Sequence, residues 1–215
     1  MKQTNTKKMV LLAMLAAVAY LVVCLIRIPA VLFLKYEPKD VVITIGGFLL
    51  GPMAAFITSL LVSLLEMVTI SETGPIGALM NLLSTCSFAC TAAFIYKKRH
   101  TVSGAVVGLI IGTVTMVSTM LLWNWLITPL YQGAPREAVV KLLIPVFLPF
   151  NSLKAGLNSA LILGLYKPVV QALRHAGLVE SRTQKSGSAK IGIYIFAGIL
   201  LTTCILLLLV LQGKL

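Results

Sequence analysis

Residues 9–28 read MVLLAMLAAVAYLVVCLIRI, a run in which Arg27 is the only charged residue. An α-helix of about 20 apolar residues is long enough to cross the ~30 Å hydrocarbon core of a bilayer. The composition agrees, since 59% of the 215 residues are hydrophobic, 11% are charged and the mean hydropathy is +1.00. A soluble domain carries about 25% charged residues. The sequence therefore predicts an all-α integral membrane protein.

Six more apolar segments follow the first helix, which we expect over residues 8–28. They span residues 41–50, 53–70, 76–96, 102–127, 142–166 and 191–211. The segment 41–50 is short, because ten helical residues reach only about 15 Å. It either crosses with the help of the preceding polar loop, or it enters the membrane and returns on the same side.

The distribution of positive charge separates these two paths. If the segment crosses, the N-terminus, the basic cluster at 97–99 and the stretch 167–190 share one side of the membrane. That side then carries 11 Lys/Arg and one acid, against six Lys/Arg and four acids on the other. Cytoplasmic loops are enriched in Lys and Arg. We therefore expect seven spans in the cell membrane, with the N-terminus cytoplasmic.

The chain is expected to have three parts. Residues 1–170 should form a six-helix membrane bundle, residues 171–190 a basic cytoplasmic linker, and residues 191–215 an additional C-terminal transmembrane helix. The formal net charge of +12 comes mainly from clusters between apolar spans. Such clusters are typical of membrane orientation signals, so we expect contact with a lipid bilayer and none with nucleic acid.

Two charged residues, Glu66 and Lys154, lie well inside the expected spans. A charge at bilayer depth costs at least about 2.5–3.5 kcal/mol, so such residues usually face a cavity or a partner. Asn151, Lys154 and Asn158 are three and four residues apart, which places them on one face of the sixth span. This face predicts a polar ligand cavity that opens to the outside. The alternative is a seam of hydrogen bonds that holds helices together.

Other spans supply candidates for the opposite wall of such a cavity. The fourth span carries Asn81, followed by serine and threonine hydroxyls. Asn124 lies near the outer end of the fifth span, between Trp123 and Trp125. Either tryptophan could stack on a planar ligand ring, but tryptophan is also common at membrane interfaces as a simple anchor.

The loop before the second segment is polar and reads KYEPKD over residues 35–40. A solvated loop with balanced charges is the ordinary interpretation. Because the loop lies at the mouth of a short helix, Tyr36, Lys39 and Asp40 are also candidates for a lid or a cavity floor.

No motif for catalysis or for a resident cofactor is present. The chain lacks a phosphate-binding G-x-x-x-x-G-K-[ST] loop, an H-E-x-x-H metal motif and a G-x-S-x-G nucleophile elbow. Its four cysteines lie in apolar stretches without metal-ligand spacing. We therefore predict no catalytic residue and no metal site. A chain with a ligand cavity and no energy source needs a partner that supplies the energy.

The first span offers a surface for close helix contact. Ala13 and Ala17 are four residues apart, and small residues in this register let another helix approach closely in lipid. The spacing alone does not say whether that helix belongs to the same bundle or to a partner.

Several stretches together resemble one family. They are LKYEPKDV at 34–41, GGFLLGP at 46–52, TGPIGALMN at 73–81, NW at 124–125, PLY at 129–131 and PFNSLKAGLN at 149–158. In this order, and over residues 8–170, they resemble the S component, or substrate-binding subunit, of energy-coupling factor (ECF) transporters of the riboflavin-specific type.

The resemblance implies a six-helix vitamin-binding subunit with a pocket near its outer face. Such a subunit docks on a transmembrane coupling subunit with two ATPase subunits and tips in the bilayer to deliver its ligand, here riboflavin or a related flavin. The family's pocket residues map onto Asn81, Asn124, Asn151 and Lys154. The family's alanine-rich motif maps onto Ala13 and Ala17, although Leu21 occupies its next small position. The seventh span departs from the family pattern.

Three alternatives remain at this point. The scaffold could carry another small vitamin or precursor. The chain could also be a stand-alone carrier driven by an ion gradient. Finally, it could be a membrane assembly subunit without a ligand, in which the face of Asn151, Lys154 and Asn158 only joins helices.

Overall fold

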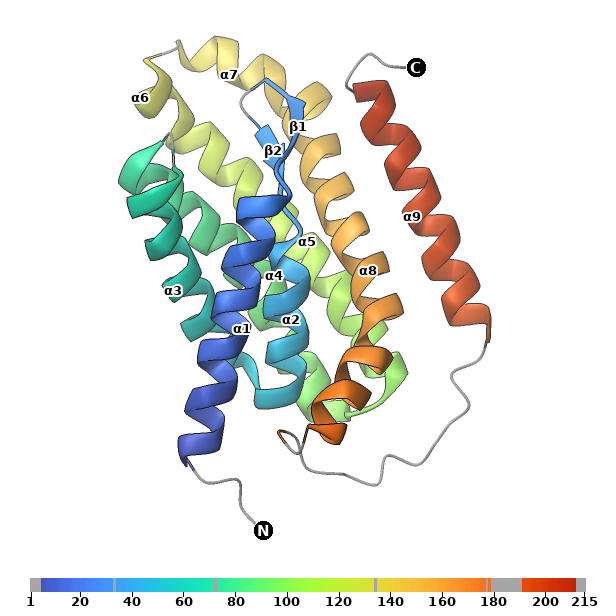
Figure 1. The fold of residues 1–215 in the computed structure, drawn as a ribbon. Helices are drawn as coiled ribbons and strands as arrows, with labels where there is room; N and C mark the ends of the chain where they lie inside the picture. The colour runs from blue at the N-terminus through green and yellow to red at the C-terminus, as the bar shows by residue number, and fades with distance from the viewer. Residues whose placement is uncertain are drawn as a thin grey trace.

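The computed structural model describes residues 5–32, 34–71, 73–133, 135–176, 178 and 191–211, and helices make up most of them (Figure 1). The long helices are α1 (Asn5–Leu25), α3 (Pro52–Thr69), α4 (Gly74–Arg99), α5 (Val102–Leu126), α8 (Leu148–His175) and α9 (Ile191–Leu211). The shorter elements are β1 (Ile28–Val31), β2 (Leu34–Tyr36), α2 (Lys39–Leu50), α6 (Thr128–Gln132), α7 (Arg136–Leu142) and the π-helix η1 (Leu143–Phe147).

The all-α membrane architecture predicted from composition is confirmed. Among the described residues, five helical stretches are long and apolar enough to cross a bilayer: Thr6–Leu25, Pro52–Thr69, Gly74–Arg99, Val102–Leu130 and Arg136–Leu173. Helix α2 has only 12 residues, and the apolar part of α9, Tyr194–Leu207, is shorter than a full span. A helix therefore forms at each of the seven expected places, but α2 and the apolar part of α9 are shorter than the length needed to cross a bilayer.

The second segment passes from one end of the bundle to the other. Strands β1 and β2 form an antiparallel hairpin in which Ile28 pairs with Tyr36. In Figure 1 this hairpin lies at the end where α1 and α3 finish, and α2 continues from it to the opposite end, where α3 begins. The hairpin segment and the short helix together cover the distance between the two ends. This matches the predicted path in which the second segment crosses with the help of the preceding loop. The loop itself is a hairpin, which the polar composition of residues 35–40 did not predict.

The two ends of the bundle differ in charge. We call the end with β1, β2, α6 and α7 the hairpin end. The opposite end carries the start of α1, the turn between α4 and α5, and the last turns of α8 (Figure 1). Lys97, Lys98 and Arg99 are exposed there in the last turn of α4, so we call it the basic end.

The sixth span is irregular at the hairpin end. The expected loop over 129–141 contains α6 and α7, and η1 then joins α7 to α8. The backbone N–H of Leu148 bonds to the carbonyl of Leu143, the five-residue spacing that defines a π turn. Pro149, one residue later, has no N–H to give to the carbonyl of Pro145. The two prolines thus accompany a local opening of the helix.

Helix α8 continues past the expected end at residue 166 and reaches His175. Pro168 lies inside it but removes only one backbone hydrogen bond. Beyond the proline, Val170 is buried against the bundle, which helps hold the last turns in place. The first residues of the linker predicted over 171–190 are therefore helical. The greater part of that linker lies outside the described residues, and its role as a separate part of the chain stays a prediction.

Helices α4 and α5 approach each other closely. A Cβ atom added to Gly108 would lie 2.8 Å from the carbonyl oxygen of Ala92, and one added to Gly112 would lie 2.8 Å from that of Phe88. Backbone atoms cannot move aside as a flexible side chain can. The two glycines therefore set the distance between these helices and allow Phe88 to be fully buried in the core between α4 and α8.

We predict that Gly112→Ala destabilises the protein. The added methyl group forces α4 and α5 apart, and overpacking of this kind typically costs about 1–3 kcal/mol. Thermal unfolding of the detergent-purified protein should show a lower Tm. Gly164→Ala is the matched control, because a Cβ at Gly164 meets nothing within 4 Å. An unchanged Tm for Gly112→Ala would contradict the role given to this close contact.

Candidate functional site

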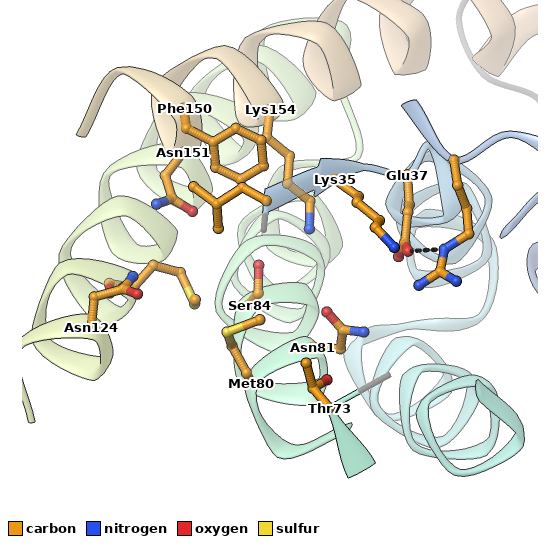
Figure 2. Close-up of a pocket in the computed structure, with 13 residues that line it drawn as sticks. Lys35, Glu37, Thr73, Met80, Asn81, Ser84, Asn124, Phe150, Asn151 and Lys154 are labelled. Atoms are coloured by element: carbon orange, nitrogen blue, oxygen red, sulfur yellow. Dashed lines mark hydrogen bonds and ion pairs between the residues drawn. The ribbon is translucent and has the colours of Figure 1, made fainter. Parts of the chain in front are cut away.

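A hollow lies at the hairpin end of the bundle, where α4, α5, α8 and the hairpin segment converge (Figure 2). It encloses a cavity of about 90 Å³, and about 710 Å³ of empty space is present when the open mouth is counted. The enclosed part is therefore narrow, and much of the volume belongs to the mouth. The lining residues are Arg27, Leu34, Lys35, Glu37, Thr73, Met80, Asn81, Ser84, Met120, Asn124, Phe150, Asn151 and Lys154.

The hollow brings together four residues singled out by the sequence. Asn81 comes from α4, Asn124 from α5, and Asn151 and Lys154 from α8. Figure 2 shows Asn124 and Asn151 on one side, Asn81 on another, and the amine of Lys154 pointing into the space between them. The spacing of three residues on α8 places Asn151 and Lys154 on the same face, as the helical period requires.

Beside the hollow, a buried lysine holds two acidic side chains. Lys39 Nζ lies 2.6 Å from both carboxylate oxygens of Glu66 and 3.1 Å from Oε2 of Glu37. Glu37 also accepts from Nε of Arg27 at 2.9 Å, the dashed contact in Figure 2. Asn81 donates to Glu66 Oε2 at 2.9 Å, so this cluster fixes one of the amides of the hollow.

A second buried cluster centres on Asp40, which is fully buried. Its carboxylate accepts from Thr85 Oγ1 at 2.7 Å and from Asn158 Nδ2 at 3.1 Å. Lys154 Nζ lies 3.4 Å from the same carboxylate. The carboxylate thus has three partners, and it positions the amine of Lys154 at the edge of the hollow.

The face of α8 named from its spacing is divided between two roles. Asn158 is fully buried and bridges Asp40 to Tyr36, whose hydroxyl donates to Asn158 Oδ1 at 3.0 Å. It joins helices and does not line the hollow, so at this position the structure matches the alternative of a hydrogen-bonded seam. Lys154 and Asn151, one and two turns earlier, do line it.

The two asparagines at the hairpin end make local hydrogen bonds. Asn124 donates to the carbonyl of Met120 at 2.7 Å and accepts from Thr128 Oγ1 at 2.9 Å, so both ends of its amide have partners. Asn151 donates to the carbonyl of Phe147 at 2.7 Å, and its side-chain oxygen turns toward the hollow in Figure 2. Asn151 is thus well placed to accept a hydrogen bond from a ligand.

The residues predicted from the loop over 35–40 are buried rather than solvated. No more than 5% of the surface of Tyr36, Lys39 or Asp40 is exposed, and none of the three lines the hollow. They lie in the two clusters beside it, where paired charges can be removed from water. Of the two interpretations of this loop, a solvated segment is therefore wrong for these side chains.

The protonation of the hairpin segment follows from this burial. Burial raises the pKa of Tyr36 above its usual value, and the charge of Asp40 raises it further, so the phenol stays protonated and can donate to Asn158. For Glu37, burial alone would raise the pKa. The charges of Lys39, Lys154 and Arg27 outweigh that effect and hold the pKa below its usual value, so Glu37 stays ionised.

Neither tryptophan lines the hollow. Trp123 is partly buried and packs against the core between α4 and α8. Trp125 is exposed on α5, where the guanidinium of Arg136 lies 5.7 Å from its ring centroid. The aromatic ring that does line the hollow is Phe150.

Several lining residues were missed from the sequence, although spacing offered a signal for some of them. Met120 lies four residues before Asn124, and Phe150 adjoins Asn151. Ser84 was not missed, because it is one of the hydroxyls after Asn81 that the sequence offered for the opposite wall. Glu66 was recognised as a costly charge but not as a neighbour of Asn81. The other lining residues that were missed are Arg27, Leu34, Lys35, Thr73 and Met80, whereas Glu37 belongs to the loop that the sequence offered as a lid or cavity floor.

The alanine pair of α1 faces out of the bundle. Ala13 and Ala17 are exposed, whereas Ala16 and Ala19 are buried in a core cluster with Ile43 of α2. The small-residue strip is therefore available to a helix from outside.

In the part of the chain that the structure describes, no group of three or more His, Cys, Asp or Glu side chains is placed to hold a metal ion. What the hollow can do chemically is donate and accept hydrogen bonds, with apolar walls formed by Leu34, Met80, Met120 and Phe150. Together with the charged groups of Arg27, Lys35, Glu37 and Lys154, this combination is typical of a binding site for a small organic molecule with polar groups.

Comparison with known proteins agrees with this architecture. Residues 7–166 match the family model for the substrate-specific component of ECF transporters. The protein named riboflavin transporter RibU of Lactococcus lactis is 30% identical over 175 residues, which cover 77% of this chain and 84% of that protein. Riboflavin transporter RibU of Staphylococcus aureus is 27% identical, with coverage of 79% and 94%. Riboflavin transporter FmnP of Bacillus subtilis is 26% identical, with coverage of 80% and 98%.

A solved structure of the S component of a bacterial ECF transporter superposes with a TM-score of 0.68 at 27% identity, covering 80% of this chain and 99% of that one. The resemblance drawn from the sequence motifs is thus confirmed, and the relatives are transporter components rather than enzymes. The chain is a multi-pass membrane protein that belongs to the family of substrate-specific components of ECF transporters.

Proposed function

We propose that this chain binds riboflavin or a closely related flavin in the hollow at the hairpin end. We further propose that it delivers the flavin inward as the substrate-binding subunit of an ATP-driven importer. The observation that carries the first proposal is the convergence of Asn81, Asn124, Asn151 and Lys154 from three helices on one hollow. The names of the similar transporters agree with this ligand.

The chemistry of a flavin suits this lining. Its ring has a planar apolar face, and one edge carries carbonyl and nitrogen acceptors. Lys154 can donate to such an acceptor, and the asparagine amides can both donate and accept. Phe150 and the two methionines, Met80 and Met120, offer apolar surface to the ring face, and methionine adapts readily to planar ligands.

The size of the hollow implies that its mouth takes part in binding. Pockets for small organic ligands usually hold about 300–1,000 Å³. The hollow reaches 710 Å³ only when its mouth is included. We therefore expect part of the flavin to occupy the mouth, next to Leu34 and Lys35 of the hairpin.

The distribution of positive charge supports one orientation of the chain in the membrane. The basic end carries the exposed cluster Lys97, Lys98 and Arg99, and such clusters favour the cytoplasm. We infer that the N-terminus is cytoplasmic in the cell membrane and that the hollow opens to the outside. This is the orientation that an importer needs to collect its ligand.

The energy is proposed to come from partners: a transmembrane coupling subunit with two ATPase subunits. The chain carries no nucleotide-binding motif. The exposed pair Ala13 and Ala17 offers a helix of the coupling subunit a surface for close packing in lipid. Uptake that persists in cells lacking the ATPase subunits would instead favour a stand-alone carrier.

The direct test is a titration of flavin-free protein with riboflavin, followed by quenching of flavin fluorescence. We predict that Asn151→Leu weakens binding by about 5- to 150-fold, the effect of leaving one or two ligand groups unpaired, worth about 1–3 kcal/mol. Ser152→Ala, at the neighbouring exposed position on α8, is the control and should bind as the unaltered protein does. Equal affinities for the two variants would remove Asn151 from the site.

Lys154→Met should abolish most binding and also lower the Tm, because it leaves the buried Asp40 carboxylate without a cation. Breaking such a pair typically costs about 3–5 kcal/mol. The double variant Lys154→Met with Asp40→Asn removes that charge. We predict that it regains much of the Tm but not the affinity for riboflavin. Recovery of both would mean that Lys154 serves stability alone.

The docking surface has its own prediction. Ala13→Phe combined with Ala17→Phe should prevent co-purification with the coupling subunit, because the large rings keep a partner helix at a distance. Riboflavin binding by the isolated chain should not change. Ala138→Phe, the same replacement at an exposed position of α7, is the control. Normal assembly of the double variant would place the docking surface elsewhere.

A further inference from the structure

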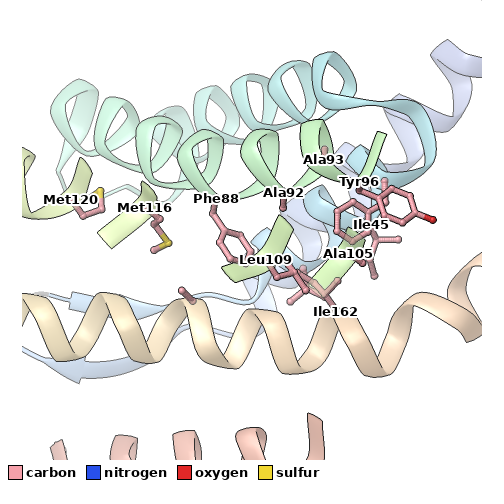
Figure 3. Close-up of a cluster of buried hydrophobic side chains, with 13 residues drawn as sticks. Ile45, Phe88, Ala92, Ala93, Tyr96, Ala105, Leu109, Met116, Met120 and Ile162 are labelled. Carbon is pink, nitrogen blue, oxygen red and sulfur yellow. The ribbon is translucent and has the colours of Figure 1, made fainter. Parts of the chain in front are cut away.

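Helix α9 lies beyond the residues that match the family model, yet it packs along α8 and reaches β1. In Figure 1 it lies on the side of α8 away from α1 and α3. Figure 3 shows α8 between the core cluster around Phe88 and the turns of α9. Helix α9 leaves Ala13 and Ala17 of α1 uncovered, so it packs on a different surface of the bundle.

One face of α9 is turned toward the bundle. Ala197 is buried, and Leu201 and Cys204 are partly buried, at a spacing of four and three residues. The opposite face is apolar and exposed, with Ile195, Phe196, Ile199 and Leu206 each at least half exposed. The helix therefore makes a one-sided contact through a defined stripe.

The stripe reaches the back of the proposed flavin site. Leu201 and Cys204 pack against a cluster of buried side chains, which we call the hairpin cluster. Its members are Ala30, Leu34, Tyr36, Val139, Phe147, Phe150, Leu153 and Leu157. Two of these, Leu34 and Phe150, also line the hollow. The stripe thus packs on the same cluster that supplies Leu34 and Phe150 to the wall of the hollow.

The register between α9 and α8 is tightly constrained at one point. A Cβ atom added to Gly156 would lie 2.9 Å from Sγ of Cys204. The glycine lets the sulfur approach the α8 backbone in the turn between Lys154 and Asn158. This close approach sets the position of Cys204, and through it the stripe, relative to the hairpin cluster.

The hairpin needs such support. A two-stranded hairpin is at best marginally stable by itself, so its position depends on what it packs against. The hairpin carries Leu34 in the wall of the hollow and Tyr36 in the hydrogen bond to Asn158. A side chain that packs behind the hairpin cluster therefore acts on the site without touching the ligand.

We propose that Leu201 and Cys204 of α9 are positioning residues for the binding site: by packing on the hairpin cluster they hold Leu34 and Phe150 in the wall of the hollow and slow the exchange of ligand. The ligand part of this proposal rests on the proposed flavin function. Removing either side chain leaves a space behind the hairpin, which the marginal hairpin fills by moving.

The test uses the full-length chain in nanodiscs. In Leu201→Ala and in Cys204→Ala we expect amide hydrogen exchange of residues 28–36 to become faster. Riboflavin should dissociate several-fold faster, with a smaller change in the association rate. Leu206→Ala removes the same number of atoms from the exposed face of α9 and should leave both quantities unchanged. Leu201→Met conserves the side-chain volume, so its hydrogen exchange at residues 28–36 and its riboflavin dissociation rate should equal those of the unaltered protein.

Gly112→Ala separates a specific effect of α9 on the hairpin from a general loss of stability. This variant is expected to lower the Tm, and its site lies outside the hairpin cluster. If its hairpin exchanges as fast as that of Leu201→Ala at an equal Tm, α9 has only a structural role and the proposal is overturned. Unchanged exchange and unchanged dissociation in both α9 variants would overturn it as well. If the unaltered protein binds no riboflavin, the proposed function fails, while the exchange of residues 28–36 still decides whether α9 holds the hairpin.

Discussion

The pairing of buried charge is the constraint on which the site depends. Lys39 and Asp40 are adjacent in sequence at the start of α2, both are buried, and each must find an opposite charge away from water. Lys39 finds Glu37 and Glu66, and Asp40 finds Lys154. These pairs join the hairpin segment, α3 and α8 to one short helix. Because an unpaired charge at this depth is costly, the pairs hold the ends of these elements in a fixed arrangement around the hollow.

This arrangement explains how polar and apolar surfaces coexist at one site. The ionic clusters lie beside the hollow and position Asn81 and Lys154 through hydrogen bonds and charge. The hairpin cluster lies on another side and supplies Leu34 and Phe150. Asn81 and Asn124 come from α4 and α5, which approach each other closely at Gly108 and Gly112. Hydrogen-bonding groups are thus held by paired charges, and apolar groups by packing.

The helices could be predicted from the sequence because the length and the apolar content of a span are local properties. The spacing of Asn151 and Lys154 on α8 likewise named two lining residues, since the helical period alone puts them on one face. The contact of Lys39 with Glu66 joins residues 27 positions apart, and no local pattern indicates it. Trp123 and Trp125 were misleading because the same residue type serves as an interface anchor. The strands of the hairpin have four and three residues, too few to show an alternating pattern.

The ion pairs described above join three formal cations, Arg27, Lys39 and Lys154, to three formal anions, Glu37, Asp40 and Glu66, so 3 − 3 leaves these six groups with no net charge. A single charge moved through a membrane potential of 100 mV involves about 2.3 kcal/mol of electrical work. When the whole group shifts as one body along the membrane normal, the contributions of the two signs cancel. A rigid shift of these six charges along the membrane normal would therefore involve no net electrical work, and a membrane potential would neither assist nor oppose such a shift through them.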